Sequence, residues 1–281
     1  MAEKSFIERV RRKFGIYPKF WLKSFLYRWT PGGWGFYREL AKLKDESYDH
    51  ERDKHPVRHK HTGESGWKEE DESSGEFVYR DYGSYEEYLN HQKVKFDEML
   101  KAGAGFGPKE VGDMRIRFYR RFRWLPYHLE KDASCVCAGA RQGTEVEVLQ
   151  DLGFKNAYGT DLNPGPENPW VREGDFMKMD EADESVDFVF CNAIDHVHDI
   201  DTFFSEQTRI LKKDGFGMYE VMAGTKGGAF EAIEWESDGA LIRKLLQYFR
   251  GVVKIDTEAH WMWFLLTDPI KSDSPEEASE S

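Results

Sequence analysis

The sequence of 281 residues has few cysteines and no long apolar segment. Its three cysteines are odd in number and lack the spacing of zinc ligands, so neither a disulfide framework nor a zinc site is indicated. No run of about 18 apolar residues is present, and the first residues lack the apolar core of a signal peptide. We therefore expect reduced cysteines in the buried strands of a cytoplasmic protein.

A net positive charge is also absent. The chain carries 40 lysines and arginines against 52 aspartates and glutamates, for a formal net charge of −12. Because nucleic-acid binding needs a basic surface, we expect no nucleic-acid partner. The mean hydropathy of −0.72 indicates that part of the chain is solvated tail or linker.

The segments outside the central part of the chain differ in composition. Residues 1–44 interleave aromatic and basic side chains, which is typical of an accessory helix or of a helix bound to a membrane surface, and both interpretations stay open. Residues 45–75 are rich in charge and poor in apolar side chains, so we expect a flexible linker. Residues 269–281 are acidic and predict a disordered tail.

Residues 76–132 have apolar side chains at helical spacing. We expect them to form a helical lead-in that caps a substrate site. Several arginines interleave with aromatic residues in this segment, namely Arg115, Arg117, Arg120, Arg121 and Arg123. These arginines form either the solvated face of an amphipathic helix or a contact for an anionic substrate.

Strand and helix patterns alternate from residue 133 to residue 268. Strands are expected at residues 134–138, 156–160, 186–191, 216–221, 252–256 and 260–266. Helices are expected at residues 143–152, 200–211 and 239–249, with a turn at 212–215 that ends the second helix. This alternation predicts an α/β fold with a largely parallel sheet and helices on both faces.

In such a sheet, ligands bind beyond the carboxyl ends of the strands. Gly139 and Gly143 follow the first expected strand, where backbone amides can approach a ligand. Asp161 follows the second expected strand and is placed to bind ribose hydroxyls. Asp175 can accept a hydrogen bond from an adenine amino group, with Phe176 beside the ring.

These segments resemble the class I S-adenosylmethionine-dependent methyltransferases, and more narrowly the type 11 group. The resemblance is carried by CAGARQGTEVEVLQDLGFKNAYGTDLNP, GDF, DFVFCNAIDHVHDID and RILKKDGFGMYEV. It implies a Rossmann-like seven-stranded sheet, here with an N-terminal helical extension, and S-adenosylmethionine as the cofactor. The cofactor site that it implies consists of Gly139, Ala140, Arg141, Gly143, Asp161, Leu162, Asp175, Phe176 and Asn192.

Two positions depart from the family pattern. Cys137 stands where the first strand usually has an acid, and Arg141 stands where the loop usually has its middle glycine. The Arg141 side chain either pairs with the methionine carboxylate of the cofactor, or points to solvent or braces a neighbouring acid. The loop also lacks the third glycine of a dinucleotide fingerprint, which argues against a nicotinamide or flavin cofactor.

A catalytic role is predicted for the loop after the strand at 186–191. In methyl transfer the protein mainly aligns the acceptor and excludes water, and a hydroxyl acceptor also benefits from a base. His196 is the candidate base, with Asp195 beside it; alternatively, His196 only packs or caps the local turn. Asp195 together with Asp199 or Asp201 offers ligands for a divalent cation, but we assign no metal site.

The leading functional hypothesis is methylation of a hydroxyl group on a small molecule or a glycan. Two alternatives stay open: a non-catalytic binding module with a cofactor fold, and a protein or lipid methyltransferase recruited to a membrane by residues 1–44. Trp235, Trp261 and Trp263 either add an aromatic surface on which a sugar stacks or belong to the core.

Overall fold

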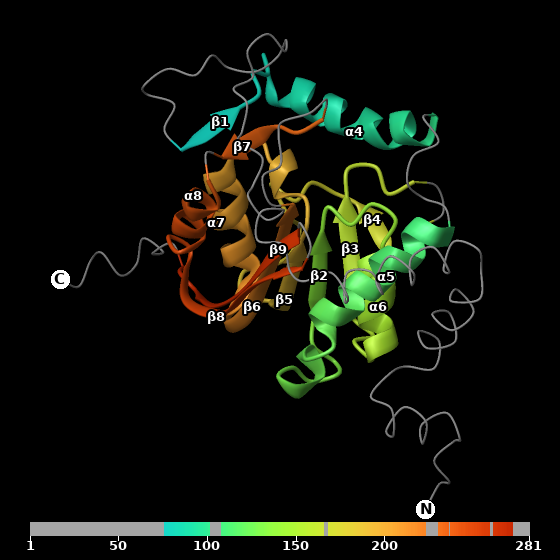
Figure 1. The fold of residues 1–281 in the computed structure, drawn as a ribbon, viewed down its shortest axis with the longest axis vertical. Helices are drawn as coiled ribbons and strands as arrows, with labels where there is room; N and C mark the ends of the chain where they lie inside the picture. Colours follow the sequence, from blue (N-terminus) through green and yellow to red (C-terminus); the bar gives the residue numbers. More distant parts are fainter. Residues whose placement is uncertain are drawn as a thin grey trace, which may run out of the picture.

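The computed structural model describes residues 76–101, 108–165, 168–222, 230–235, 237–258 and 261–271 (Figure 1). The predictions for residues 1–44 and 45–75 lie outside these ranges, as does the tail after Lys271. Within the described ranges, no helix has the length and apolar character needed to cross a membrane.

A seven-stranded sheet forms the centre of the molecule (Figure 1). Its spatial order is β4 (Val171–Glu173), β3 (Tyr158–Asp161), β2 (Cys135–Ala138), β5 (Val186–Cys191), β6 (Leu211–Met222), β9 (Trp261–Pro269) and β8 (Phe249–Glu258). The first five strands are mutually parallel, and β9 runs antiparallel to both of its neighbours. The predicted Rossmann-like, mostly parallel sheet is confirmed.

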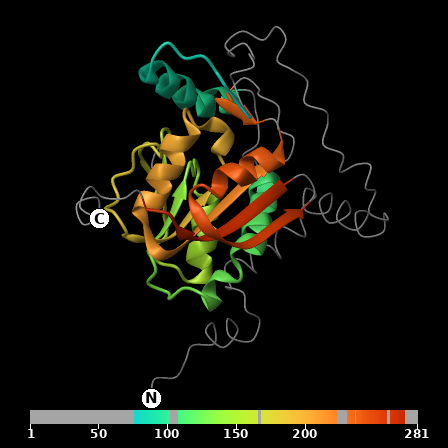
Figure 2. The ribbon, with the colours of Figure 1, turned by 90° about the vertical axis from the view of Figure 1, so that its left-hand side faces the viewer.

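Helices cover both faces of this sheet (Figures 1 and 2). On one face lie α5 (Pro108–Phe122) and α6 (Thr144–Leu152), and on the other lie α7 (Ile200–Ile210) and α8 (Asp238–Leu245). Side chains of β2 alternate between the two faces of the sheet and so contribute to the apolar core on each face. Val136 packs on the α7 side, while Cys135 and Cys137 pack on the α6 side. All three cysteines are free and buried, as expected.

A cap lies over the carboxyl ends of the parallel strands (Figure 1). It consists of α4 (Tyr85–Lys101) and a two-stranded antiparallel sheet of β1 (Phe77–Tyr79) and β7 (Ile233–Trp235). Hydrogen bonds attach α4 to the rest of the fold. The Tyr88 hydroxyl donates to the His196 carbonyl at 3.0 Å, and the side-chain amide of Asn163 donates to the Lys93 carbonyl at 2.9 Å. The helices expected in residues 76–132 are present, whereas β1 was not predicted.

Two predicted element ends are wrong. Residues 212–215 do not form a turn that ends α7, because Leu211 already has extended backbone, is fully buried and pairs with Val186 as the start of β6. The pairing of β5 with β6 shifts register here, because Val186 pairs with Leu211 but Phe188 pairs with Phe216. Residues 212–215 lie between these two pairs, at the irregularity in β6. The third predicted helix is too long, because Phe249 is buried as the first residue of β8.

The predicted tail begins too early in the chain. Pro269 is the last residue of β9, the Ile270 amide donates to the Tyr248 carbonyl at 2.8 Å, and the Lys271 ammonium donates to the Thr208 carbonyl at 2.7 Å. Residues 269–271 therefore belong to the fold and not to a tail.

The arginines named in this segment differ in exposure: some are buried and ion-paired, whereas Arg123 is exposed. Arg115 and Arg121 are only 5% and 3% exposed. Arg115 pairs with Glu147 and Asp151 of α6, while the Arg121 Nε donates to Glu220 of β6 at 2.9 Å. Neither interpretation made from the sequence holds for Arg115 and Arg121, because the sequence pattern does not show that the sheet and α6 supply carboxylates to these two side chains.

The three tryptophans considered for sugar stacking contribute mainly to packing. Trp235 and Trp263 are buried, so the sugar-stacking interpretation fails for both. Trp261 is partly exposed, but the Arg117 guanidinium lies over its ring at 4.0 Å from the centroid.

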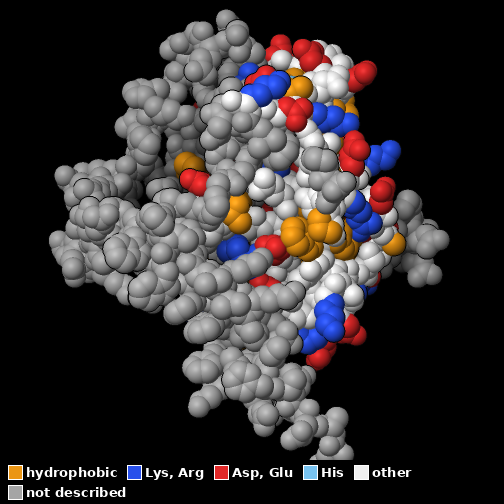
Figure 3. Space-filling view, turned by 90° about the vertical axis from the view of Figure 1, so that its right-hand side faces the viewer, with side chains coloured by type: hydrophobic (Ala, Val, Ile, Leu, Met, Phe, Trp, Pro, Cys, Tyr) orange, Lys and Arg blue, Asp and Glu red, His pale blue; other side chains and the backbone are white. Residues whose placement is uncertain are grey.

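Acidic and basic side chains are interspersed on the face shown in Figure 3. The expected absence of a nucleic-acid partner stays a prediction.

Candidate active site

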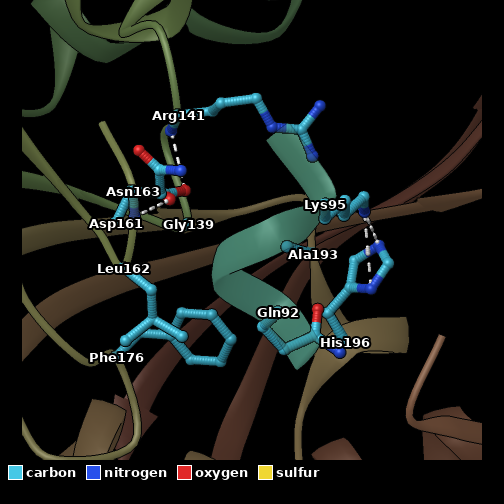
Figure 4. Close-up of a pocket in the computed structure, with 10 residues that line it drawn as sticks. All are labelled: Gln92, Lys95, Gly139, Arg141, Asp161, Leu162, Asn163, Phe176, Ala193 and His196. Atoms are coloured by element: carbon cyan, nitrogen blue, oxygen red, sulfur yellow. Dashed lines mark hydrogen bonds between the residues drawn. The ribbon is translucent and has the colours of Figure 1, made fainter. Parts of the chain in front are cut away.

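A cavity lies at the carboxyl ends of β2, β3 and β5 and is also lined by α4, with a volume of about 450 Å³ that includes the part open to solvent. The order of the sheet places it where β2 separates β3 from β5, which is the switch point of a doubly wound sheet. Figure 4 shows Asp161, Leu162 and Phe176 on one side and Lys95 and His196 on the other. We call these the β3 side and the α4 side.

Backbone amides hold the β3 side in place. The Asp161 carboxylate accepts hydrogen bonds from the Arg141 amide and the Asn163 amide, both at 2.9 Å (Figure 4). Gly139 has a φ of +73°, and a Cβ there would lie 3.0 Å from the Ala193 Cβ. A side chain at this position would therefore be strained and would crowd the cavity wall.

Arg141 replaces the loop glycine at an energetic cost. Its φ of +44° lies in the left-handed region, which costs a non-glycine residue about 1–2 kcal/mol. The hydrogen bond from its amide to Asp161 offsets part of this cost, as does the bond that its carbonyl accepts from Asn168 at 3.1 Å. The loop is thus shaped by the same carboxylate that faces the cavity.

The structure brings many of the predicted site residues together. The predicted residues that line the cavity are Gly139, Arg141, Asp161, Leu162, Phe176 and His196. Phe176 is 6% exposed and packs edge-on against Phe203, so its ring has a fixed orientation. Asn192 and Asp195 do not line the cavity, although they belong to the same loop as His196.

Three other predicted cofactor residues also lie outside the lining, each for a structural reason. Ala140 is buried against β3, where a Cβ on Gly159 would lie 2.5 Å from the Ala140 Cβ. Gly143 is the N-cap of α6. A Cβ there would lie 2.8 Å from the Val171 side chain, so the glycine lets the start of α6 pack closely against β4. The Asp175 carboxylate accepts hydrogen bonds from the Tyr85 hydroxyl at 2.5 Å and from the Met177 amide at 2.8 Å.

The α4 side is built around His196. Its Nδ1 lies 2.9 Å from the Phe230 carbonyl, and its Nε2 contacts the Lys95 Nζ (Figure 4). Because a carbonyl only accepts, Nδ1 carries the proton, and the lone pair of the neutral ring is on Nε2. That lone pair faces Lys95, so the nitrogen that a general base needs is already engaged.

Burial controls the charges on the α4 side. It lowers the pKa of Lys95 to about 8, and the nearby Arg141 contributes in the same direction. Burial also lowers the pKa of His196, and the Lys95 charge lowers it further. At neutral pH the imidazole is therefore uncharged. Burial raises the pKa of Asp195, although the attraction of Lys95 opposes this shift.

A cluster on this side has the composition of a metal site. One ligand atom each from Asp195, His196 and Glu231 lie within 4.8 Å of one another. The Lys95 amine contacts the imidazole nitrogen that a cation would use, so we assign no metal to the cluster. The alternative with Asp199 or Asp201 is wrong, because Asp199 accepts from the Thr202 amide as the N-cap of α7 and Asp201 pairs with Lys244 and Tyr248.

Comparison with protein families adds to this geometry. Residues 136–218 match the family described as a methyltransferase domain. Within the chain, residues 136–218 therefore carry the pattern of an S-adenosylmethionine-dependent methyltransferase domain. The matched segment runs from β2 into β6 and contains the whole β3 side of the cavity, whereas α4 lies outside it. Among curated proteins, none matches the sequence.

Solved structures share the methyltransferase fold. The Burkholderia thailandensis 1,6-didemethyltoxoflavin-N1-methyltransferase is 17% identical, with coverage of 74% of this chain and 100% of its own and a TM-score of 0.52. A chain of the Haloferax volcanii complex that contains the Trm112 methyltransferase activator is 16% identical, with coverage of 63% and 98% and a TM-score of 0.50. Identities this low show the fold alone.

The sequence analysis missed the residues that α4 contributes to this cavity, Gln92 and Lys95, and the lining residues Asn163 and Ala193. A signal for the first pair was present. Tyr88, Gln92 and Lys95 follow helical spacing, and Tyr88 is fully buried, so the face that they share points into the molecule. Polar side chains on a buried helix face are candidates for a site.

Proposed function

We propose that this chain transfers a methyl group from S-adenosylmethionine to a hydroxyl group of a small molecule or a glycan. The observation that carries this proposal is the two-sided cavity, with a carboxylate and a glycine turn on the β3 side and a nitrogen base on the α4 side. A hydroxyl acceptor must lose a proton during attack on the methyl group, so a base opposite the cofactor suits it.

The β3 side is the proposed cofactor side. Asp161 would bind the ribose hydroxyls, since its backbone hydrogen bonds hold the carboxylate in place at the cavity. Phe176 and Leu162 would contact the adenine ring, and Gly139 would let the cofactor approach the backbone. We propose no direct cofactor contact for Ala140, Gly143, Asp175 and Asn192, because these four residues lie outside the lining of the cavity.

A small acceptor is supported by one of the solved structures that share this fold. The similar Burkholderia enzyme was crystallised with 1,6-didemethyltoxoflavin and S-adenosylhomocysteine, which supports a cofactor beside a small acceptor in this fold.

Two measurements test the proposal. Calorimetric titration with S-adenosylmethionine should show saturable binding at one site. Labelled S-adenosylmethionine should then transfer its methyl group to members of a panel of phenols and methyl glycosides, and not to matched amines or carboxylates. Transfer only to amine, carboxylate or carbon acceptors would refute the hydroxyl assignment while leaving the cofactor assignment in place.

A further inference from the structure

Lys95 reaches the active site from α4, outside the segment that matches the methyltransferase family. We propose that Lys95 is the base that takes the proton from the acceptor hydroxyl, and that His196 is a positioning residue which holds the Lys95 amine. This inference rests on the proposed hydroxyl acceptor, which it deepens by naming the proton acceptor.

Geometry favours Lys95 over His196 as the base. The neutral His196 ring has a single lone pair, on Nε2, and the Lys95 Nζ occupies it. A neutral Lys95 amine donates one proton to that lone pair and keeps its own lone pair free for a second partner. The His196 side chain is only 12% exposed and is held by the Phe230 carbonyl, so it fixes the direction of the amine.

Charged or titratable groups from several elements face Lys95. They are Arg141 from the loop after β2, Asp161 at the end of β3, Asp195 and His196 of the 3₁₀ helix η2 (Ile194–His196), and Glu231 before β7. Burial and Arg141 favour the neutral amine, while the three carboxylates favour the ammonium. With a pKa of about 8, about one tenth of the Lys95 side chains are neutral at pH 7.

The proposed step balances in protons and electrons. The acceptor O–H bond breaks, and its proton moves to the lone pair of the Lys95 Nζ. A lone pair of the acceptor oxygen forms the bond to the methyl carbon, and the electron pair of the breaking carbon–sulfur bond stays on sulfur. The Lys95 ammonium then returns the proton to solvent, and His196 keeps the same protonation state throughout.

The first test needs no acceptor. Trace labelling with 1-fluoro-2,4-dinitrobenzene, read by tandem mass spectrometry across a pH series, reports the neutral fraction of each lysine amine. Lys95 should become reactive with a midpoint near pH 8, whereas the exposed Lys93 on the same helix is the internal reference. Parallel profiles for the two lysines would overturn the proposal.

The second test uses the fastest hydroxyl probe from the acceptor panel. Lys95→Met should lower kcat by roughly 10²–10⁴-fold and remove the rise in rate through pH 8, because no amine remains to take the proton. Cofactor affinity should be retained. Lys93→Met removes an exposed lysine that pairs with Glu173, and it should keep the wild-type profile.

Variants of His196 separate the two roles. His196→Ala should lower kcat but keep the rise near pH 8, since Lys95 is still present. The opposite result, with the rise lost in His196→Ala and kept in Lys95→Met, would make His196 the base. Methylation of a hydroxyl by Lys95→Met at the wild-type rate would refute this inference alone. A panel methylated only on nitrogen would refute the proposed function and, with it, the acceptor hydroxyl from which Lys95 takes the proton.

A rescue experiment covers the case in which Lys95→Met does not fold. Lys95→Cys treated with bromoethylamine carries a thioether analogue of lysine with a less basic amine. The native cysteines are all buried, so the alkylation is directed to position 95. Activity should return with its rise moved to lower pH, and a fully alkylated, folded protein that stays inactive would contradict the proposal.

Discussion

The two sides of the cavity are constructed in different ways. On the β3 side, the functional groups follow neighbouring strands of one sheet, and backbone amides of Arg141 and Asn163 hold the key carboxylate. On the α4 side, side chains 101 positions apart, Lys95 and His196, meet through their nitrogens. The proposed cofactor side can therefore be predicted from strand ends, whereas the proposed acceptor side depends on how the cap is placed.

The largest effect on cofactor binding is expected at Asp161. Asp161→Ala should weaken S-adenosylmethionine binding by about 1–3 kcal/mol, because a charged hydrogen bond to the ribose is lost. Lys95 labelling should keep its midpoint near pH 8, since burial is the main cause of that shift. Calorimetry and trace labelling check both results. Asp180→Ala removes an exposed carboxylate and serves as the control; equal losses in the two variants would contradict the role of Asp161.

Alanine substitutions at Gly139 and Gly153 separate the effect of backbone strain on stability from the effect of cavity shape on cofactor binding. Gly139→Ala and Gly153→Ala each place a Cβ at positive φ, so each should cost about 1–2 kcal/mol of unfolding free energy. Only Gly139 lies at the cavity, so only Gly139→Ala should also weaken cofactor binding. Denaturant titration and calorimetry measure the two quantities, and unchanged cofactor affinity in Gly139→Ala would place the cofactor elsewhere.

Gln92 tests the α4 side without touching its basic pair. Its amide donates to the Phe230 carbonyl at 2.8 Å, the same carbonyl that orients His196. Gln92→Ala should raise KM for the acceptor by a factor equivalent to about 1 kcal/mol, with little change in cofactor affinity. Steady-state kinetics measure this, with the exposed Gln247→Ala as the control. A change in cofactor affinity alone would assign Gln92 to the other side.

The smallest effect is expected where the two sides are joined. The Tyr85 hydroxyl of α4 donates to Asp175 at 2.5 Å, but the pair is exposed to solvent. Tyr85→Phe should therefore cost only about 0.5 kcal/mol of unfolding free energy. A double-mutant cycle with Asp175→Asn measures the coupling. A coupling energy several times larger would show that the cap and the cofactor side act as one unit.

The sheet could be predicted where strands are buried on both faces. The strand expected at 186–191 matches β5 in full, because every residue from Phe188 to Cys191 is buried and the run is apolar. The three-residue strands β1, β4 and β7 were missed, because no period is visible in so few residues. Their pairing depends on partners elsewhere in the chain, as with β1 and β7.

The β3 side of the cavity follows from the order of the amino acids alone, because its turns and its acid come directly after strands whose apolar pattern is local. Gly139 and Asp161 are predicted there from the strand ends, Phe176 is carried over from the family resemblance, and all three line the cavity. The α4 side exists only in the folded molecule. The pairing of Lys95 with His196 depends on the docking of α4, and the burial that lowers the pKa of Lys95 comes from residues far away in the chain. Local patterns carry no information about such burial, since it arises only when the cap closes over the sheet.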